Sequence, residues 1–297
     1  MSLGERVGLV VTTHEGPGPR LQRCLAAIAA SDPDVAVVVV DNSGSEASLT
    51  DAPCANIEHV RVDNRGFGAA ANVGFAHPAV ADAELIGLLN DDVVVGDAWL
   101  RPLVECLDAE PAVAAVQPML VLADTDPPLV NSLGVELDRF GAGSDIGYRT
   151  TESEVADRGP RRVDMVTGGA LLLRRAFLDD VDGFDERLFL YYEDVDLCRR
   201  GSELGWEFRC VSASRVEHEM GASTGDLGDD RTFLQERNRL VTAARFGSAA
   251  LIGRAMWLSI KRLRHEPRRA HRHAFLHGIA RMPRALYERG VATWSRR

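Results

Sequence analysis

The feature that most constrains the fold is a repeated alternation along residues 6–122. Short, continuously apolar segments are separated by segments of helical periodicity, and the apolar segments end in polar residues. Such apolar strands are typical of a mostly parallel sheet covered by helices on both faces, so we predict an α/β fold. The predicted strands are residues 6–16, 35–45, 56–64, 83–93 and 112–122, and the predicted helices are residues 18–31, 66–77 and 97–111, the last with Asp97 as its cap.

Polar side chains gather where these predicted strands end. In an open parallel sheet, ligands bind beyond the carboxyl ends of the strands. Asp91 and Asp92 could be ordinary turn residues. Alternatively, because neighbouring side chains on a strand point opposite ways, one carboxylate could bind a divalent cation and the other could bind sugar hydroxyls. The strand-end residues are Thr12, Asp41, Asn64, Asn90, Asp91 and Asp92.

The stretch "DNRGFGAAANVG", residues 63–74, has two interpretations. It lacks both the GK[ST] of a Walker loop and the GxGxxG spacing of a dinucleotide site. It could be a glycine turn that starts a tightly packed helix. Alternatively, Arg65 and backbone amides could face a diphosphate, with Asn72 making a polar contact under the ligand.

Two later stretches carry further candidates. Residues 124–162 predict an edge hairpin and a mobile loop, and residues 163–186 predict a strand, a glycine turn and a helix. In "YYEDVDLCRRGSELGW", a predicted helix, we interpret Asp196 as a cap, whereas the aromatic setting of Glu193 and Asp194 suits a carboxylate base. His218 in "VEHEMGAS" could be a neutral ligand or a diphosphate contact.

The charge is unevenly distributed. Residues 231–297 contain 16 Lys and Arg against three acids, a charge of +13, so with a total of −10 the rest of the chain carries −23. We predict one domain over residues 1–230 and a basic helical extension over residues 231–297. The five cysteines form no CxxC pair, and we see neither a signal peptide nor an apolar run of about 18 residues, which predicts free thiols and a cytoplasmic protein.

Together the motifs resemble those of inverting glycosyltransferases of family 2 with the GT-A fold, in particular their bacterial rhamnosyltransferase-like branch. The resemblance covers about residues 6–225, and its most specific block is "FDE…EDVDLCRR…GW". The chain departs from the family pattern at Asn90, where many members carry the first Asp of a D-x-D motif. The other matching motifs are Thr12, Asp41-Asn42-Ser43, "NRGFGAAANVG", "LNDDV", "TGGALLLRR" and "VEHEMGAS".

The resemblance implies a Rossmann-like GT-A domain that transfers a sugar, with inversion, from a nucleotide-diphospho-sugar. The implied acceptor is a glycan or a polyprenyl-diphosphate-linked molecule in cell-wall or polysaccharide synthesis. The implied donor is dTDP-rhamnose, with UDP-galactofuranose or another UDP-hexose as the alternative. The implied roles are Thr12 and Asp41 at the pyrimidine base, Asp91 at the ribose, Asp92 and His218 on Mg²⁺ or Mn²⁺, Asp194 as the base, and Glu193 as its neighbour that binds the acceptor or orients Asp194.

Other functions fit the residues less well. A nucleotidyltransferase usually needs Lys and Arg in a glycine-rich loop, and a receiver domain needs a Lys at a strand end, but Lys261 is the only lysine. A non-catalytic nucleotide-sugar binding module would keep the roles of Asp41 and Asp92 without needing Asp194. The presence of Glu193 and Asp194 therefore favours the enzyme.

The basic extension mixes apolar residues with arginines, and we expect Pro267 and Pro283 to divide it into separate helices. These helices could pack on the catalytic domain or on a second subunit as a homodimer. They could instead lie on the anionic cytoplasmic leaflet as a peripheral membrane segment. Nucleic acid is a weaker partner, because the acidic body would repel phosphates.

Overall fold

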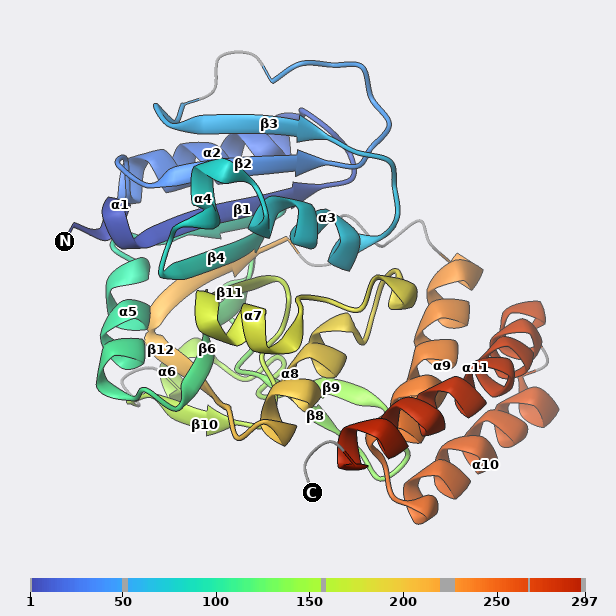
Figure 1. The fold of residues 1–297 in the computed structure, drawn as a ribbon. Helices are drawn as coiled ribbons and strands as arrows, with labels where there is room; N and C mark the ends of the chain where they lie inside the picture. The colour runs from blue at the N-terminus through green and yellow to red at the C-terminus, as the bar shows by residue number, and fades with distance from the viewer. Residues whose placement is uncertain (1, 50–52, 156–158, 220–227, 267, 295–297) are drawn as a thin grey trace.

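A computed structural model describes residues 2–49, 53–155, 159–219, 228–266 and 268–294, with side chains to residue 290. A large mixed sheet forms the body, and a group of helices lies beside it at one end (Figure 1). The first half of the sheet is parallel, in the order β3–β2–β1–β4. These strands are β1 (Val7–Thr13), β2 (Ala36–Asp41), β3 (Ile57–Arg61) and β4 (Leu85–Asn90).

The second half of the sheet contains one central strand that runs antiparallel to both of its neighbours. β11 (Ala170–Arg174) runs antiparallel between β4 and β6 (Val113–Leu122), and β12 (Glu207–His218) runs parallel to β6. The prediction of a mostly parallel sheet is confirmed. The remaining strands pair at the margins: β5 (Val93–Val95) and β10 (Arg161–Val163) with β12, and β7 (Val130–Ser132) with β6.

Each face of the sheet has its own apolar core, because successive strand residues point to opposite faces. Leu9 and Val37 pack toward one core, whereas their neighbours Val10 and Val38 pack toward the other. The first face is covered by α2 (Pro19–Ser31) and α5 (Leu100–Ala109). The other face is covered by α3 (Phe67–Phe75), α4 (Pro78–Ala81), α7 (Arg175–Val181) and α8 (Glu193–Glu203), and the short α1 (Leu3–Arg6) precedes β1.

The predicted edge hairpin is present. β8 (Val135–Leu137) and β9 (Gly143–Asp145) form a two-stranded antiparallel sheet, and α6 (Glu152–Val155) follows. The predicted cap of α5 is wrong. This helix begins at Leu100, and the residue before it is Trp99, which makes no side-chain cap and is 1% exposed. Burial of the Trp99 indole, rather than a backbone hydrogen bond to the Asp97 carboxylate, therefore fixes the start of the helix.

The basic C-terminal segment is helical, as predicted. It contains α9 (Gly228–Phe246), α10 (Ala249–His265) and α11 (Arg269–Trp294), and the domain boundary predicted after residue 230 falls in the first turn of α9. Pro267 lies outside the described residues. The break predicted at Pro283 is wrong, because α11 continues through that residue. Met282 and Ala285 on either side pack against Ala244 of α9, and this contact holds the helix together across the proline.

Two general expectations can be compared with the structure. All five cysteines are buried and free. Within the described residues, no helix combines the length and the apolar character that a membrane crossing requires.

Candidate active site

A pocket of about 440 Å³ lies where β1, β2 and β4 end. It brings together the predicted residues Thr12, Asn64, Asn90 and Asp91. The structure adds neighbours that our sequence analysis missed, although His14 simply continues the polar series after β1. The further lining residues are Thr13, His14, Asn42, Phe67, Phe189 and Leu190, with Asp230, Phe233 and Leu234 from α9.

Asp91 is the buried acidic group of this pocket. It is 4% exposed, and its Oδ2 accepts a hydrogen bond of 2.5 Å from the hydroxyl of Thr13. Burial raises the pKa of Asp91 to about 6, and the negative charge of Asp92 adds to this rise. A buried carboxylate with one strong donor has capacity for further hydroxyl donors, such as those of a ribose.

Asp92 lies beside His218 rather than in the pocket itself. Asp92 Oδ1 is 3.4 Å from His218 Nε2, and the other ring nitrogen, Nδ1, is 2.6 Å from Asn131 Oδ1. In the tautomer in which Nδ1 donates to Asn131 Oδ1, the Nε2 lone pair faces the carboxylate of Asp92. Residues 126 positions apart in the chain thus present two metal-binding atoms to one another. Residues 220–227, the end of the "VEHEMGAS" motif included, lie outside the described residues.

Asp41 does not line the strand-end pocket. It is 1% exposed, and its carboxylate accepts a hydrogen bond from the backbone N–H of Ser43 and lies 3.4 Å from His59 Nε2. The neighbouring Asn42 lines the pocket instead. The geometry therefore shows Asp41 shaping the turn that presents Asn42, and its contact with a base stays a prediction.

The glycine-rich turn is occupied by contacts within the protein. The N–H of Gly66 donates to Asn64 Oδ1, and the N–H of Phe67 donates to the carbonyl of Phe189. One of the two interpretations of this stretch had backbone amides facing a diphosphate, but these two amides are not free to do so. Gly66 has φ +100°, and a Cβ there would lie 2.1 Å from the Phe189 carbonyl oxygen, so the glycine permits a close approach of the two segments.

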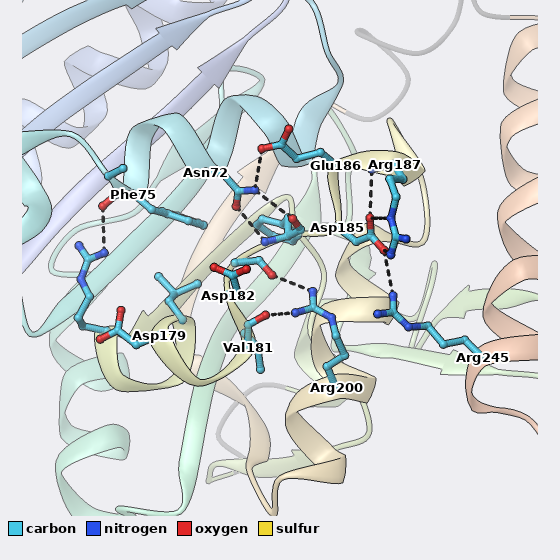
Figure 2. Close-up of a pocket in the computed structure, with 15 residues that line it drawn as sticks. Asn72, Phe75, Asp179, Val181, Asp182, Asp185, Glu186, Arg187, Arg200 and Arg245 are labelled. Atoms are coloured by element: carbon cyan, nitrogen blue, oxygen red, sulfur yellow. Dashed lines mark hydrogen bonds and ion pairs between the residues drawn. The ribbon is translucent and has the colours of Figure 1, made fainter. Parts of the chain in front are cut away.

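Arg65 and Asn72 point away from the pocket. The exposed Arg65 guanidinium pairs with Glu186 at 2.6 Å. The amide of Asn72 bonds the backbone N–H and carbonyl of Phe184, and it lines a separate cavity of about 870 Å³ (Figure 2). The structure therefore does not bring these two residues to the strand-end pocket, and their contact with the donor stays a prediction.

Glu193 and Asp194 begin α8, on the other side of Phe67. Asp194 accepts hydrogen bonds from the N–H of Val195 at 2.7 Å and from the N–H of Gly168 at 3.2 Å. A Cβ added to Gly168 would be 3.0 Å from the Phe67 ring and 4.0 Å from the Asp194 Cβ, so the pocket wall and the acidic pair adjoin. This adjacency is the geometry that a base beside a donor site requires.

The two carboxyl groups differ in their environment. Burial raises the pKa of Asp194 to about 6, although the two backbone hydrogen bonds oppose this rise. Burial, together with the neighbouring Asp194, holds the pKa of Glu193 well above its ordinary value. Glu193 is 7% exposed, and its Oε2 has no hydrogen-bond partner in the described part of the chain. The backbone hydrogen bonds to Asp194 favour its ionised form, so Asp194 is the member of this pair that ionises first, and the charge of one acid opposes ionisation of the other.

The backbone before this pair is strained, which the sequence did not indicate. Phe189, Tyr191 and Tyr192 have φ values of 69°, 66° and 70°, a region that costs side chains of this kind about 1–3 kcal/mol each. Asn238 of α9 is fully buried, and its Nδ2 lies 2.7–3.0 Å from the carbonyls of Leu188, Leu190 and Tyr191. The extension thus holds the segment that presents the acidic pair.

Asp196 has a structural role, but not as a cap. It is 1% exposed and accepts charged hydrogen bonds from Arg200 and from Arg245 of α9, at 2.7 and 2.6 Å. Arg245 also pairs with Asp185 at 2.9 Å, as Figure 2 shows. These contacts join α8 to the extension beside the strained segment.

The sequence of this chain is similar to those of known proteins. A model of the family described as "Glycosyltransferase like family 2" matches residues 5–243. The N-acetylglucosaminyl-diphospho-decaprenol L-rhamnosyltransferase of Mycobacterium tuberculosis is 31% identical over 73% of this chain and 77% of its own length. Rhamnosyltransferase WbbL of Escherichia coli K12 is 25% identical over 71% of this chain and 83% of its own length.

Solved structures show the same fold. GalNAc-T7, crystallised with UDP, GalNAc and Mn²⁺, aligns with a TM-score of 0.63 at 15% identity, over 82% of this chain and 48% of its own. Mannosyltransferase PcManGT from Pyrobaculum calidifontis aligns with a TM-score of 0.55 at 15% identity, over 96% and 86% of the two chains. The domain is therefore of the GT-A class. The chain belongs to glycosyltransferase family 2, which confirms the family inferred from its motifs.

Proposed function

We propose that this glycosyltransferase transfers L-rhamnose from dTDP-rhamnose, with inversion, to a polyprenyl-diphosphate-linked glycan acceptor in cell-wall or polysaccharide synthesis. The observation that carries the proposal is one buried, hydrogen-bonded carboxylate, Asp194, beside a pocket at the strand ends. The names of the two relatives, both rhamnosyltransferases, support the choice of sugar. A lipid-linked acceptor would make the enzyme a peripheral protein at the cytoplasmic face of a membrane.

The residues around Asp92 fit Mg²⁺ or Mn²⁺. Asp92 Oδ1 and His218 Nε2 are both metal-binding atoms, and they face one another across 3.4 Å. Within the residues that the structure describes, no group of three His, Cys, Asp or Glu side chains could hold a metal, so diphosphate oxygens would supply further ligands. When bound, the metal would neutralise the charge that develops on the leaving diphosphate.

The chain's own residues supply the remaining chemistry. Asp194 would accept the proton of the acceptor hydroxyl as its oxygen bonds to the anomeric carbon and the bond to the diphosphate breaks. The displacement from the opposite face would invert that carbon, and the nucleoside diphosphate would leave. Glu193, in its protonated form, would donate a hydrogen bond to the acceptor, while Thr12 and Asp91 would hold the nucleoside.

A donor screen tests the sugar. The protein would be incubated with a polyprenyl-diphosphate-linked acceptor and, in separate reactions, dTDP-rhamnose, UDP-galactofuranose or UDP-glucose. We expect transfer from dTDP-rhamnose and an inverted anomeric configuration by NMR. Transfer only from a UDP-sugar would contradict the proposed donor, and donor binding without any transfer would indicate a binding module.

Calorimetry tests the metal. We expect dTDP to bind with Mg²⁺ or Mn²⁺ and to lose most of its affinity in EDTA, because the chain has no lysine before Lys261 to neutralise the diphosphate. Equal affinity in EDTA would rule out the metal and return Asp92 and His218 to a structural pair.

A further inference from the structure

The extension carries an exposed surface that the active site does not use. The 17 residues of α10 contain four basic residues and no acidic ones. Arg262 pairs with the buried Glu236, whereas Arg254, Lys261 and Arg264 are exposed. None of these three forms an ion pair within the described residues. Positive charge is therefore left unneutralised along one side of this helix.

Aromatic rings occupy the same surface. Phe140, in the hairpin between β8 and β9, stacks on Trp257 of α10 with ring centroids 5.8 Å apart and planes 18° apart. The Arg139 guanidinium lies 4.8 Å from the Phe140 centroid, and Lys261 Nζ lies 5.4 Å from the Trp257 centroid. Trp257 is 53% exposed. We call Arg139, Phe140, Arg254, Trp257 and Lys261 the basic aromatic face; four of them line a groove of about 530 Å³.

The nearby acidic side chain is turned into the hairpin. The Asp138 carboxylate accepts hydrogen bonds from the N–H groups of Phe140 and Ala142, at 2.7 and 2.8 Å. The hairpin is also joined to α10. The fully buried Arg239 donates hydrogen bonds to the carbonyl of Phe140 in the hairpin and to the carbonyl of Ala255 in α10. These hydrogen bonds therefore fix the position of the hairpin that carries Arg139 and Phe140 relative to α10.

The same hairpin touches the start of the catalytic helix. The hydroxyl of Tyr192 donates to the carbonyl of Gly141 at 2.9 Å and accepts from the N–H of Gly143 at 3.2 Å. Tyr192 directly precedes Glu193 and Asp194. The β8–β9 hairpin therefore connects the basic aromatic face to the residue that directly precedes Glu193 and Asp194.

We propose that the basic aromatic face docks on the anionic headgroups of a lipid bilayer. Charge favours this partner, because cations on an exposed helix are attracted to an anionic leaflet and Trp prefers the interface between headgroups and chains. Docking there would bring Asp194 toward the headgroup region, where the diphosphate of a lipid-linked acceptor lies. The choice of acceptor rests on the proposed function, but the docking itself does not.

Vesicle flotation with the full chain tests the face without any sugar chemistry. The vesicles would be pure phosphatidylcholine, or phosphatidylcholine with one third phosphatidylglycerol, at low and at high salt. We expect binding only to the anionic vesicles and only at low salt. The double variant Arg254→Glu/Lys261→Glu should bind at least about 25-fold less, since each basic residue near such a surface contributes about fivefold.

Matched variants identify the surface. Arg101→Glu/Arg161→Glu makes the same charge change on exposed residues of α5 and β10, far from α10 in Figure 1, and should bind like the wild type. Arg272→Glu/Arg281→Glu does so on exposed positions of α11. Tryptophan emission should shift to the blue with anionic vesicles in the wild type, and this shift should diminish in Trp257→Phe.

Three results would overturn the proposal. The first is wild-type protein that ignores anionic vesicles at low salt. The second is release by the α11 variant but not by the α10 variant, which would place docking elsewhere. The third is salt-sensitive dimerisation by light scattering that the α10 variant abolishes while vesicles are not bound, which would make the acidic body of a second copy the partner. Circular dichroism would check that each variant is folded, and a lack of rhamnosyl transfer would leave all three readouts intact.

Discussion

The two sides of the catalytic cleft are built by different means. The donor side consists of residues at the carboxyl ends of parallel strands, so the register of the sheet places Thr12, Asn90 and Asp91 together. The base side is a segment with three left-handed residues, held by Asn238 from 47 to 50 positions further along the chain. The polar residues of the donor side are thus placed by the sheet, whereas the segment that presents the base is held by the C-terminal extension, which also contributes Phe233 and Leu234 to the pocket wall.

The largest effect should come from the base. We expect Asp194→Asn to lower kcat by about 10²–10⁴-fold while dTDP binding stays nearly unchanged, because the amide cannot accept the proton. Glu193→Gln is the matched control: it mimics the protonated state of Glu193 and should lose far less. Rates would be measured by single-turnover transfer. Near-normal turnover of a folded Asp194→Asn variant would disprove the assignment, and a greater loss in Glu193→Gln would make Glu193 the base.

The next effect should come from the donor side. Asp92→Asn keeps the shape but removes a charged metal ligand, and we expect dTDP affinity in Mn²⁺ to fall by about 100-fold, to the value of the wild type in EDTA. Asn131→Leu removes only the partner of the His218 ring, which should cost about tenfold in metal affinity. Calorimetric titration with and without metal would measure both. Retained metal dependence in Asp92→Asn would show that other residues bind the ion.

The same contrast explains what the sequence could predict. Apolar strands with polar ends predicted the sheet and the meeting of Thr12 with Asp91, because the period of a strand is a local signal and the carboxyl ends of parallel strands lie at one edge of the sheet. The motif at residues 193–194 predicted the acidic pair. Departures at helix boundaries include Asp97 and Pro283, where burial of Trp99 and packing of Met282 on α9 outweigh local preference.

The other contacts of the site could not be predicted, because the residues that make them are distant in sequence. Nothing near Asn238 indicates that its amide will bond the carbonyls before α8, and nothing near Asn131 indicates that it will orient His218. The glycine turn shows the same limit. Gly66 suggested a phosphate loop, but its φ and its close contact with Phe189 serve the packing of the strained segment.

Loosening the base side should have a smaller effect that is selective for kcat. Asn238→Ala removes the donor for three carbonyls, and we expect it to lower the free energy of unfolding by about 1–3 kcal/mol and kcat by roughly tenfold, with dTDP affinity unchanged. Thr242→Ala, at another buried polar position of α9, is the control and should leave kcat intact. Denaturant titration and single-turnover rates would separate the two quantities. Equal losses in kcat and in dTDP affinity would mean that the extension supports both sides of the cleft alike.

The mildest test is pH, and it again distinguishes the two sides. Because the folded-state pKa of Asp194 is raised to about 6, its basic form is lost at a higher pH than that of an ordinary Asp. At saturating donor, kcat should be level above pH 7, fall about twofold at pH 6 and about tenfold at pH 5. Protonation of Asp91, whose pKa is also about 6, should instead raise the KM for the donor.

Unfolding does not account for such a loss, because the sign is opposite for this group. A carboxyl whose pKa is higher in the folded than in the unfolded state adds stability as the pH falls from about 6 toward its ordinary value. Circular dichroism at pH 5 should therefore report a folded protein with a reduced kcat. A kcat that stays level down to pH 5 in folded protein would show that Asp194 is ionised throughout this range, and that the base side is more open to water than its burial indicates.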